Sequence, residues 1–322
     1  MFLALLVSPP PVPSLTLTMH SELYELRTYY HLGNYAAART EGEALATSLT
    51  APAAVVERDT LLARISIADG HAADVVSSIP TSPPPAPSLA AACLHASYVT
   101  ADSDDARAEV VRALGAALTP ESEPAPAPDA TLRVIAAAVY GAEGDWDAAL
   151  RAVATGPPTL EAQAAQVRIL LAMHRPDVAT GVVDAMKADD EDATLTQLSA
   201  AAVGLATGGA DAVADATYTY TDLVERHGST PVLLNGLALC HLAGGRPIDA
   251  DRLVGEALAK DPGCAETLVN AIVVATARGK KDELIGRYEA ALSTAAPGCG
   301  WLRDRAAAEA ALDRAIAGVG GT

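Results

Sequence analysis

Two successive segments decide the fold, residues 244–262 with the sequence GGRPIDADRLVGEALAKDP and residues 278–297 with the sequence RGKKDELIGRYEAALSTAAP. Each follows an apolar stretch, and their glycines Gly245 and Gly279 lie 34 residues apart. This period is typical of the tetratricopeptide repeat, a pair of antiparallel helices, A and B, joined by a tight turn. The sequence therefore predicts an all-α fold, an alpha-solenoid of tetratricopeptide-like helix pairs.

A small residue five positions after the turn glycine is a second mark of the repeat, because it lets helix B approach helix A. Ala250 occupies this position in the first segment, whereas Leu284 occupies it in the second and departs from the pattern. One pair cannot bury its apolar face without neighbours, so further copies are required. Fainter copies place the small residue at Ala38, Ala149, Ala179 and Ala216.

The solenoid is expected to occupy residues 19–300, followed by a C-terminal helix and tail over residues 301–322. Residues 1–18 contain a short apolar run without a basic segment before it, and Met19 opens the first well-patterned stretch. We predict a disordered leader or a mis-assigned start there. Proline repeats favour extended chain, so the proline-rich residues 80–88 and 119–129 are predicted to be surface loops.

Composition and charge exclude several classes of function. Half of the 322 residues are hydrophobic and only 4% are aromatic, which favours closely packed helices over a sheet core. The chain contains 40 acidic and 22 basic residues, which gives a net charge of −18. Nucleic acids and anionic lipid headgroups are recognised through lysine and arginine clusters, so neither is an expected partner. Four scattered cysteines form no disulfide framework and fit a reducing cytosolic compartment.

One stretch, residues 193–210, carries no charge over 18 positions and raises the question of a bilayer span. Polar residues in its middle argue instead for a helix covered by other helices. Asp192 is placed to act as its N-cap, and Gly208 and Gly209 are placed to end it. The apolar residues recur at helical spacing, at Leu195, Leu198, Ala202 and Leu205.

Motifs of catalysis and metal binding do not stand out. The acidic run 189–192 lacks the glycine and glutamate that a calcium-binding loop needs at its sixth and twelfth positions. Cys240 and His241 are adjacent on an apolar helix, where neighbours point about 100° apart, so core packing is the expected role. We expect no catalytic residue, no cofactor and no metal ion.

The inner faces of the A helices are the expected partner-binding surface, because a helical solenoid presents these faces to a peptide or a protein domain. The predicted residues are Val232, Asn235, Leu239, Glu266, Val269, Asn270 and Val273. Their apolar and amide chemistry suits a partner held by burial and backbone hydrogen bonds. The alternative is that they pack within the superhelix. On the first interpretation, Asn270→Arg combined with Val273→Asp should abolish partner binding and leave the helical content intact.

Three stretches in this region resemble the epsilon subunit family of coatomer, in the same order along the chain. They are DEDATLTQLSAAAVGLATGG at 190–209, LLNGLALCHLAGGRPIDA at 233–250 and AETLVNAIVVATARGK at 265–280. Residues 29–38 and 55–71 are similar to the N-terminal portion of that family, so the resemblance extends over about residues 21–312. The proline-rich loops, the leader and several aromatic positions depart from the family pattern.

The resemblance implies a non-catalytic structural subunit of the COPI vesicle coat, in retrograde Golgi-to-ER and intra-Golgi transport. It implies that the chain binds and stabilises the C-terminal region of the alpha coatomer subunit. It also implies a cytoplasmic protein, peripheral on Golgi membranes and coated vesicles through the coat complex, without membrane insertion of its own. Two alternatives stay open from the residues alone: a free tetratricopeptide adaptor that recruits peptide ligands, and an enzyme with scattered catalytic groups.

Overall fold

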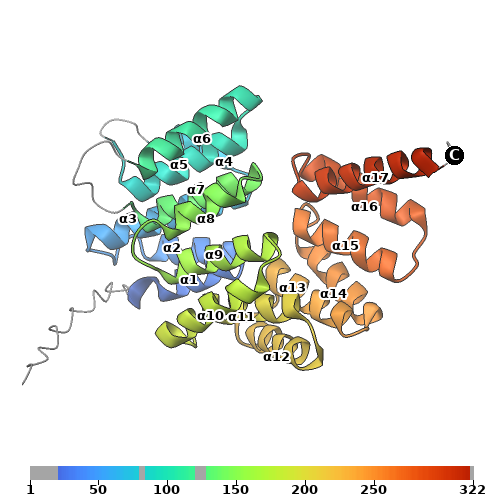
Figure 1. Cartoon of the computed structure of the whole chain (residues 1–322). Coiled ribbons are helices and arrows are strands. Elements are labelled where there is room, and N and C mark those ends of the chain that lie inside the picture. Colours follow the sequence, from blue (N-terminus) through green and yellow to red (C-terminus); the bar gives the residue numbers. More distant parts are fainter. Residues whose placement is uncertain (1–20, 80–83, 120–127, 320–322) are drawn as a thin grey trace, which may run out of the picture.

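The computed structural model describes residues 21–79, 84–119 and 128–319, and these residues form helices and short loops without a strand (Figure 1). A 3-10 turn, Ser21–Leu23, precedes the first α-helix. The predicted leader, residues 80–83 of the first proline-rich stretch and residues 120–127 of the second lie outside the described residues. Residues 84–86 form a loop as predicted, whereas Pro87 and Ser88 belong to the helix Pro87–Thr100, because proline is tolerated in the first turn of a helix. The α-helices are α1 (Tyr24–His31), α2 (Tyr35–Ala44), α3 (Pro52–Ala68), α4 (Ala72–Ser78), α5 (Pro87–Thr100), α6 (Asp104–Leu118), α7 (Ala130–Ala142), α8 (Trp146–Ala154), α9 (Leu160–Ala172), α10 (Pro176–Asp190), α11 (Thr194–Thr207), α12 (Ala210–His227), α13 (Pro231–Ala243), α14 (Pro247–Lys260), α15 (Ala265–Ala277), α16 (Asp282–Ala295) and α17 (Gly300–Val319).

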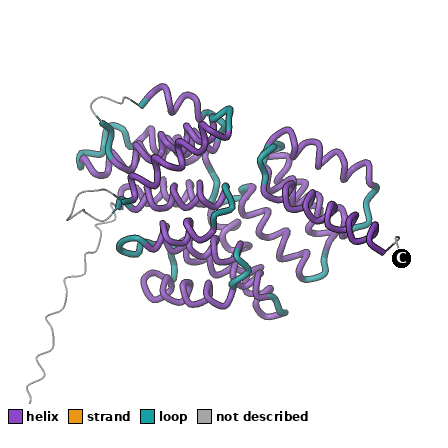
Figure 2. The backbone as a smooth tube through the Cα atoms, turned by 45° about the horizontal axis from the view of Figure 1, so that its top comes forward, coloured by secondary structure: helices purple, strands orange, loops and turns teal. Residues whose placement is uncertain are grey.

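The helices pair in chain order, α1 with α2 up to α15 with α16, and most pairs share one type of turn (Figure 2). The turn residue has a positive φ, and the next backbone N–H donates to the carbonyl five residues earlier at 2.8–2.9 Å. This is the Schellman motif, in which a residue with left-handed backbone conformation ends a helix. The backbone N–H groups at and after this residue donate to the last carbonyls of the helix. The turn residues are Gly33, Gly70, Gly144, His174, Gly245 and Gly279.

The predicted small residue of helix B is buried in every pair where the sequence places one. Ala38, Ala149, Ala179 and Ala250 are 0% exposed, and Ala216 is 2% exposed. Val75 holds the corresponding position after Gly70 and is 4% exposed. Leu284, the departure from the pattern, is only half-buried. The predicted pairing is therefore confirmed, and its least regular unit is the last pair, α15 with α16.

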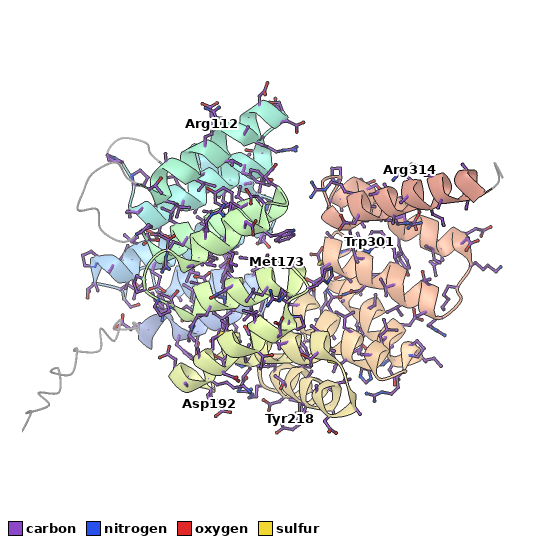
Figure 3. All side chains as sticks on the ribbon, in the orientation of Figure 1. Arg112, Met173, Asp192, Tyr218, Trp301 and Arg314 are labelled. Carbon is purple, nitrogen blue, oxygen red and sulfur yellow. The ribbon has the colours of Figure 1, made fainter. Side chains whose placement is uncertain are left out.

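Successive pairs stack into a curved superhelix, because each A helix packs against the preceding B helix and against the next A helix. In Figure 1 the stack forms two arms, one from α3 to α9 and one from α13 to α17. Arg303 at the start of α17 reaches across, and its Nη2 donates to the carbonyl of Ala142 at the end of α7 at 3.1 Å. Figure 3 labels Met173 and Trp301 on these two arms.

The first helix pair closes onto the middle of the superhelix. Thr230 donates its Oγ1 proton to the carbonyl of Leu32 at 2.6 Å, across 198 residues of sequence. The same oxygen accepts from the backbone N–H of Leu233 and so caps α13. Gly33 fits here because a Cβ at this position would lie only 2.7 Å from Cγ2 of Val232. The turn after α1 is therefore docked against the start of α13.

Helix α11 corrects two details of the sequence-based expectation. Its N-cap is Ala193 and not Asp192, and the nearby side-chain acceptor is Asp190, which receives the backbone N–H groups of Asp192 and Ala193. The predicted leucine stripe is only half-buried. Several helices pack on α11, namely α1, α9, α10, α12 and α13, so burial is distributed around the helix and not confined to one stripe. The buried residues of α11 are Thr196, Ser199, Ala201 and Val203. Gly208 ends the helix as predicted, with a φ of 74°.

No helix among the described residues combines the length and the apolar character that crossing a bilayer would require. The charge-free stretch at 193–210 comprises the N-cap Ala193, α11, its C-terminal turn and the first residue of α12.

A substitution at Gly236 tests how closely α12 and α13 approach each other. A Cβ at Gly236 would overlap the ring of Tyr220, which is 7% exposed and has little room to move. We expect Gly236→Ala to lower the free energy of unfolding by about 1–3 kcal/mol, measured by urea denaturation, because overpacking displaces the ring.

Gly255→Ala is the matched control, since nothing lies within 4 Å of the added Cβ on α14. It should raise the free energy of unfolding by about 0.5–1 kcal/mol through helix propensity. Equal effects of the two substitutions would contradict the packing described.

Candidate partner-binding face

The three predicted residues of α13 differ in their accessibility. Asn235 is 0% exposed, and its Nδ2 donates to Oγ1 of Thr267 on α15 at 2.8 Å. It therefore joins two neighbouring A helices and is not accessible to a partner. Val232 is half-buried beside the turn at Gly33, and Leu239 is half-buried farther along the helix.

The four predicted residues of α15 also divide into buried and accessible ones. Asn270 is 6% exposed, and Val269 packs partly against the cluster around Leu268 and Leu292. Glu266 and Val273 are exposed, Val273 by 37%. Residues seven apart lie on the same side of a helix, so Glu266 and Val273 share one face. An arginine at position 270 would have to enter the packed interior, so the proposed Asn270→Arg variant would disturb folding as well as binding.

The first residue of this face, Glu266, lies within electrostatic reach of Arg168 on α9. Glu266 is exposed to solvent, although neighbouring groups partly displace water from its carboxyl. This partial removal of water raises the pKa of the Glu266 carboxyl, and the positive charge of Arg168 on α9 partly offsets the effect. We use the term inner face for Arg168, Glu266, Val269 and Val273. A partner-binding role for these residues remains a prediction.

Next to the inner face lies an ionic network that the sequence interpretation missed. Arg27 on α1 binds Glu57 on α3 through two hydrogen bonds, at 2.5 and 2.8 Å. Arg64 on α3 binds Glu161 on α9 at 2.5 Å. The network therefore connects the first, second and fifth helix pairs.

Aromatic and imidazole groups surround Arg64. Its guanidinium lies over the ring of Tyr30, 4.8 Å from the ring centre, and the Tyr30 ring packs edge-on against His31. Burial alone would raise the pKa of Glu161, but the positive charge of Arg64 and its hydrogen bond to the carboxylate outweigh burial and lower it. Burial also lowers the pKa of His31 to about 4, and the positive charge of Arg64 acts in the same direction.

A weak sequence signal for this network exists. Arg64 stands in the apolar run LLARISIA, where a charged side chain needs a buried partner or an exit to solvent. Its partner Glu161 is 97 residues away, beyond the reach of any local pattern. Sequence periodicity could therefore flag Arg64 but could not identify the partner.

The chemistry of these surfaces is that of packing and charge pairing. No group of three His, Cys, Asp or Glu side chains within the described ranges is arranged to hold a metal ion. Cys240 is fully buried in the core around Tyr220 and Leu233, as predicted. Nδ1 of the neighbouring His241 lies 3.9 Å from Oδ2 of Asp249. Burial lowers the pKa of the His241 imidazole.

The comparison with known proteins points to one family. The profile described as coatomer epsilon subunit matches residues 19–319. The chain belongs to the coatomer epsilon subunit family. It is 35% identical to coatomer subunit epsilon-2 of Oryza sativa subsp. indica over 294 residues, which cover 91% of this chain and 95% of the relative.

Other members of the family are similar along most of their length. Coatomer subunit epsilon of Caenorhabditis elegans is 32% identical, with 92% of this chain and 98% of the relative covered. A crystal structure of a tetratricopeptide repeat protein from Parabacteroides merdae is 14% identical, with a TM-score of 0.49 over 84% of this chain and 91% of that chain. The assignment to the family rests on the sequence relatives and not on this last likeness.

His31 provides a pH test of the network. An unfolded histidine titrates near a pKa of about 6.5, whereas His31 in the fold titrates at about 4. Between these values the unfolded chain binds a proton that the folded chain does not, so stability falls as the pH falls. We expect His31→Gln to reduce the proton uptake on unfolding, measured from the pH dependence of the unfolding free energy between pH 6 and 5, by about one proton.

His71→Gln is the control, because His71 is exposed and its Nδ1 lies 3.9 Å from Oδ2 of Asp74 at the surface, far from the network. It should change the slope less than His31→Gln does. A His31→Gln variant with the wild-type slope would show that His31 is charged in the folded protein near pH 6.

Proposed function

We propose that the chain is a non-catalytic structural subunit of the coatomer vesicle coat. In this proposal it binds and stabilises the C-terminal region of the alpha coatomer subunit in retrograde Golgi-to-ER and intra-Golgi transport. Membership of the coatomer epsilon subunit family supports this role. The relatives from rice and C. elegans bear the name coatomer subunit epsilon, and the chain covers at least 95% of each of these two.

The proposed mode of binding is based on one observation, the exposed apolar side chain of Val273 on α15. Val273 is 37% exposed on a helix whose other sides are packed, and it shares its face with Glu266. Apolar surface of this kind gains free energy when a partner covers it. Glu266 lies within electrostatic reach of Arg168 on α9, and in the proposal the partner segment contacts both α9 and α15.

The charge of the chain is compatible with this role. A net charge of −18 disfavours direct contact with anionic headgroups. In the proposal the chain is cytoplasmic and reaches Golgi membranes and coated vesicles only through the coat complex. Affinity for the membrane is then supplied by other subunits.

Co-purification tests the proposed partner. The full chain is mixed with the purified C-terminal region of the alpha coatomer subunit, and the complex is isolated by size-exclusion chromatography at high salt. A stoichiometric complex that survives the salt supports the proposal, because burial of apolar surface is not screened. The absence of a complex, or one that exchanges freely and dissociates in salt, would favour a transient adaptor instead.

Val273→Asp tests the face itself. We expect this substitution to weaken binding of the alpha C-terminal region by about tenfold or more, measured by isothermal titration calorimetry, because the complex would bury an unpaired carboxylate. Circular dichroism should show unchanged helical content, since Val273 makes no part of the buried core.

Val178→Asp is the matched control for charge and exposure. Val178 on α10 is 40% exposed, close to the 37% of Val273. The control should bind like the wild type. Equal affinities for Val273→Asp and the wild type would place the partner on another surface.

A further inference from the structure

The two arms of the superhelix meet through a polar contact and not through a shared core. No hydrophobic cluster in the described ranges contains residues of both α3–α9 and α13–α17, and no helix of one arm packs extensively on a helix of the other. A hydrogen bond does span the arms, from Nη2 of Arg303 on α17 to the carbonyl of Ala142 on α7, at 3.1 Å. Both residues are exposed to solvent, and polar contacts in water contribute little to holding a structure closed.

The start of α17 is firmly attached to its own arm. Trp301 and Leu302 pack against the last apolar cluster of the solenoid. Arg305 binds Glu289 on α16, and its guanidinium lies 5.5 Å from the centre of the Trp301 ring. Arg303 stands between these anchored residues, so its side chain reaches toward the first arm from a fixed position.

The end of α7 attracts a positive charge. The turn that follows α7 donates to the carbonyls of residues 139–141, and the next carbonyl, that of Ala142, accepts from Arg303. The last carbonyls of a helix carry a partial negative charge. Glu143 adds a full negative charge as the next residue, and its carboxylate accepts a hydrogen bond from the hydroxyl of Tyr98. The guanidinium is therefore held at this junction by charge and not by burial.

We propose that the hydrogen bond from Arg303 to Ala142 is a reversible clasp that closes the two arms on each other. While the clasp is formed, the arms have the arrangement of Figure 1. When it breaks, no apolar cluster between the arms has to come apart, and the arms separate through a change in superhelical curvature. A solenoid can bend in this way because each pair contacts only its neighbours.

The clasp is a property of the free chain and does not depend on the proposed function. It sets the distance between the end of α7 and the start of α17. It therefore determines the curvature that the superhelix presents to any partner.

Förster transfer between two dyes measures the distance between the arms. Ala116 on α6 and Ala310 on α17 are exposed, and labels on non-natural residues at these positions leave the native cysteines unmodified. Arg303→Gln removes the charge, so we expect it to raise the ratio of open to closed molecules by about two- to fivefold. Arg303→Lys keeps the charge and should give a ratio between those of Arg303→Gln and the wild type.

Arg314→Gln is the matched control. Arg314 lies on the same helix, is exposed and makes no ion pair in the described structure (Figure 3). Both substitutions change the net charge equally, and the control should keep the wild-type ratio. Raising the salt concentration from about 0.01 M to about 1 M should open the wild type and the control, because salt screens the attraction. Arg303→Gln should respond much less.

Thermal unfolding separates the clasp from the fold. Arg303 is exposed and belongs to no hydrophobic cluster of the described residues, so Arg303→Gln should melt at the wild-type temperature. Equal ratios of open to closed molecules in Arg303→Gln and the wild type would overturn the inference, and so would a salt response that the substitution leaves intact. A lower melting temperature with an unchanged ratio would assign Arg303 to the fold. None of these results depends on binding of the alpha coatomer subunit, so they leave the proposed function untouched.

Discussion

The close approach of the two helices in each pair is the constraint on which the rest of the structure depends. In most pairs a left-handed turn residue ends helix A, and a buried residue five positions later, usually an alanine, lets helix B lie against it. Ala250 and Ala149 serve this purpose without any polar contact. Since each pair leaves an apolar face uncovered, pairs must stack, and stacking of similar pairs produces a superhelix. The two arms follow from this repetition.

The interior of the superhelix depends on contacts between distant parts of the chain. Arg64 and Glu161 connect α3 to α9, and Thr230 connects the first turn to α13. These polar contacts fix the relative positions of pairs that local packing would leave adjustable. A buried pair of charges contributes little net stability but penalises any arrangement that separates its members. The network therefore fixes α1, α3 and α9 relative to one another, and the bond from Thr230 to Leu32 fixes the first turn against α13.

Much of this architecture was predictable from local pattern. The 34-residue spacing of Gly245 and Gly279 predicts the pairs, and the alanines after each turn are buried as expected. The candidate face was only partly predictable, because exposure depends on which helix packs on which side. Asn235 resembles a groove residue in sequence, yet its amide binds Thr267 inside the fold. Arg64 pairs with Glu161, which is 97 residues away, and no local sequence period encodes that distance.

Hydrogen–deuterium exchange of the full chain, alone and with the C-terminal region of the alpha coatomer subunit, tests the central claim most directly. The claim is that a coat partner is held between the arms, against α9 and α15. It predicts slower exchange in peptides from 160–172 and 265–277 on binding, and unchanged exchange in peptides from the outer helices α6 and α12. Protection confined to α6 or α12, with α9 and α15 unaffected, would contradict the account.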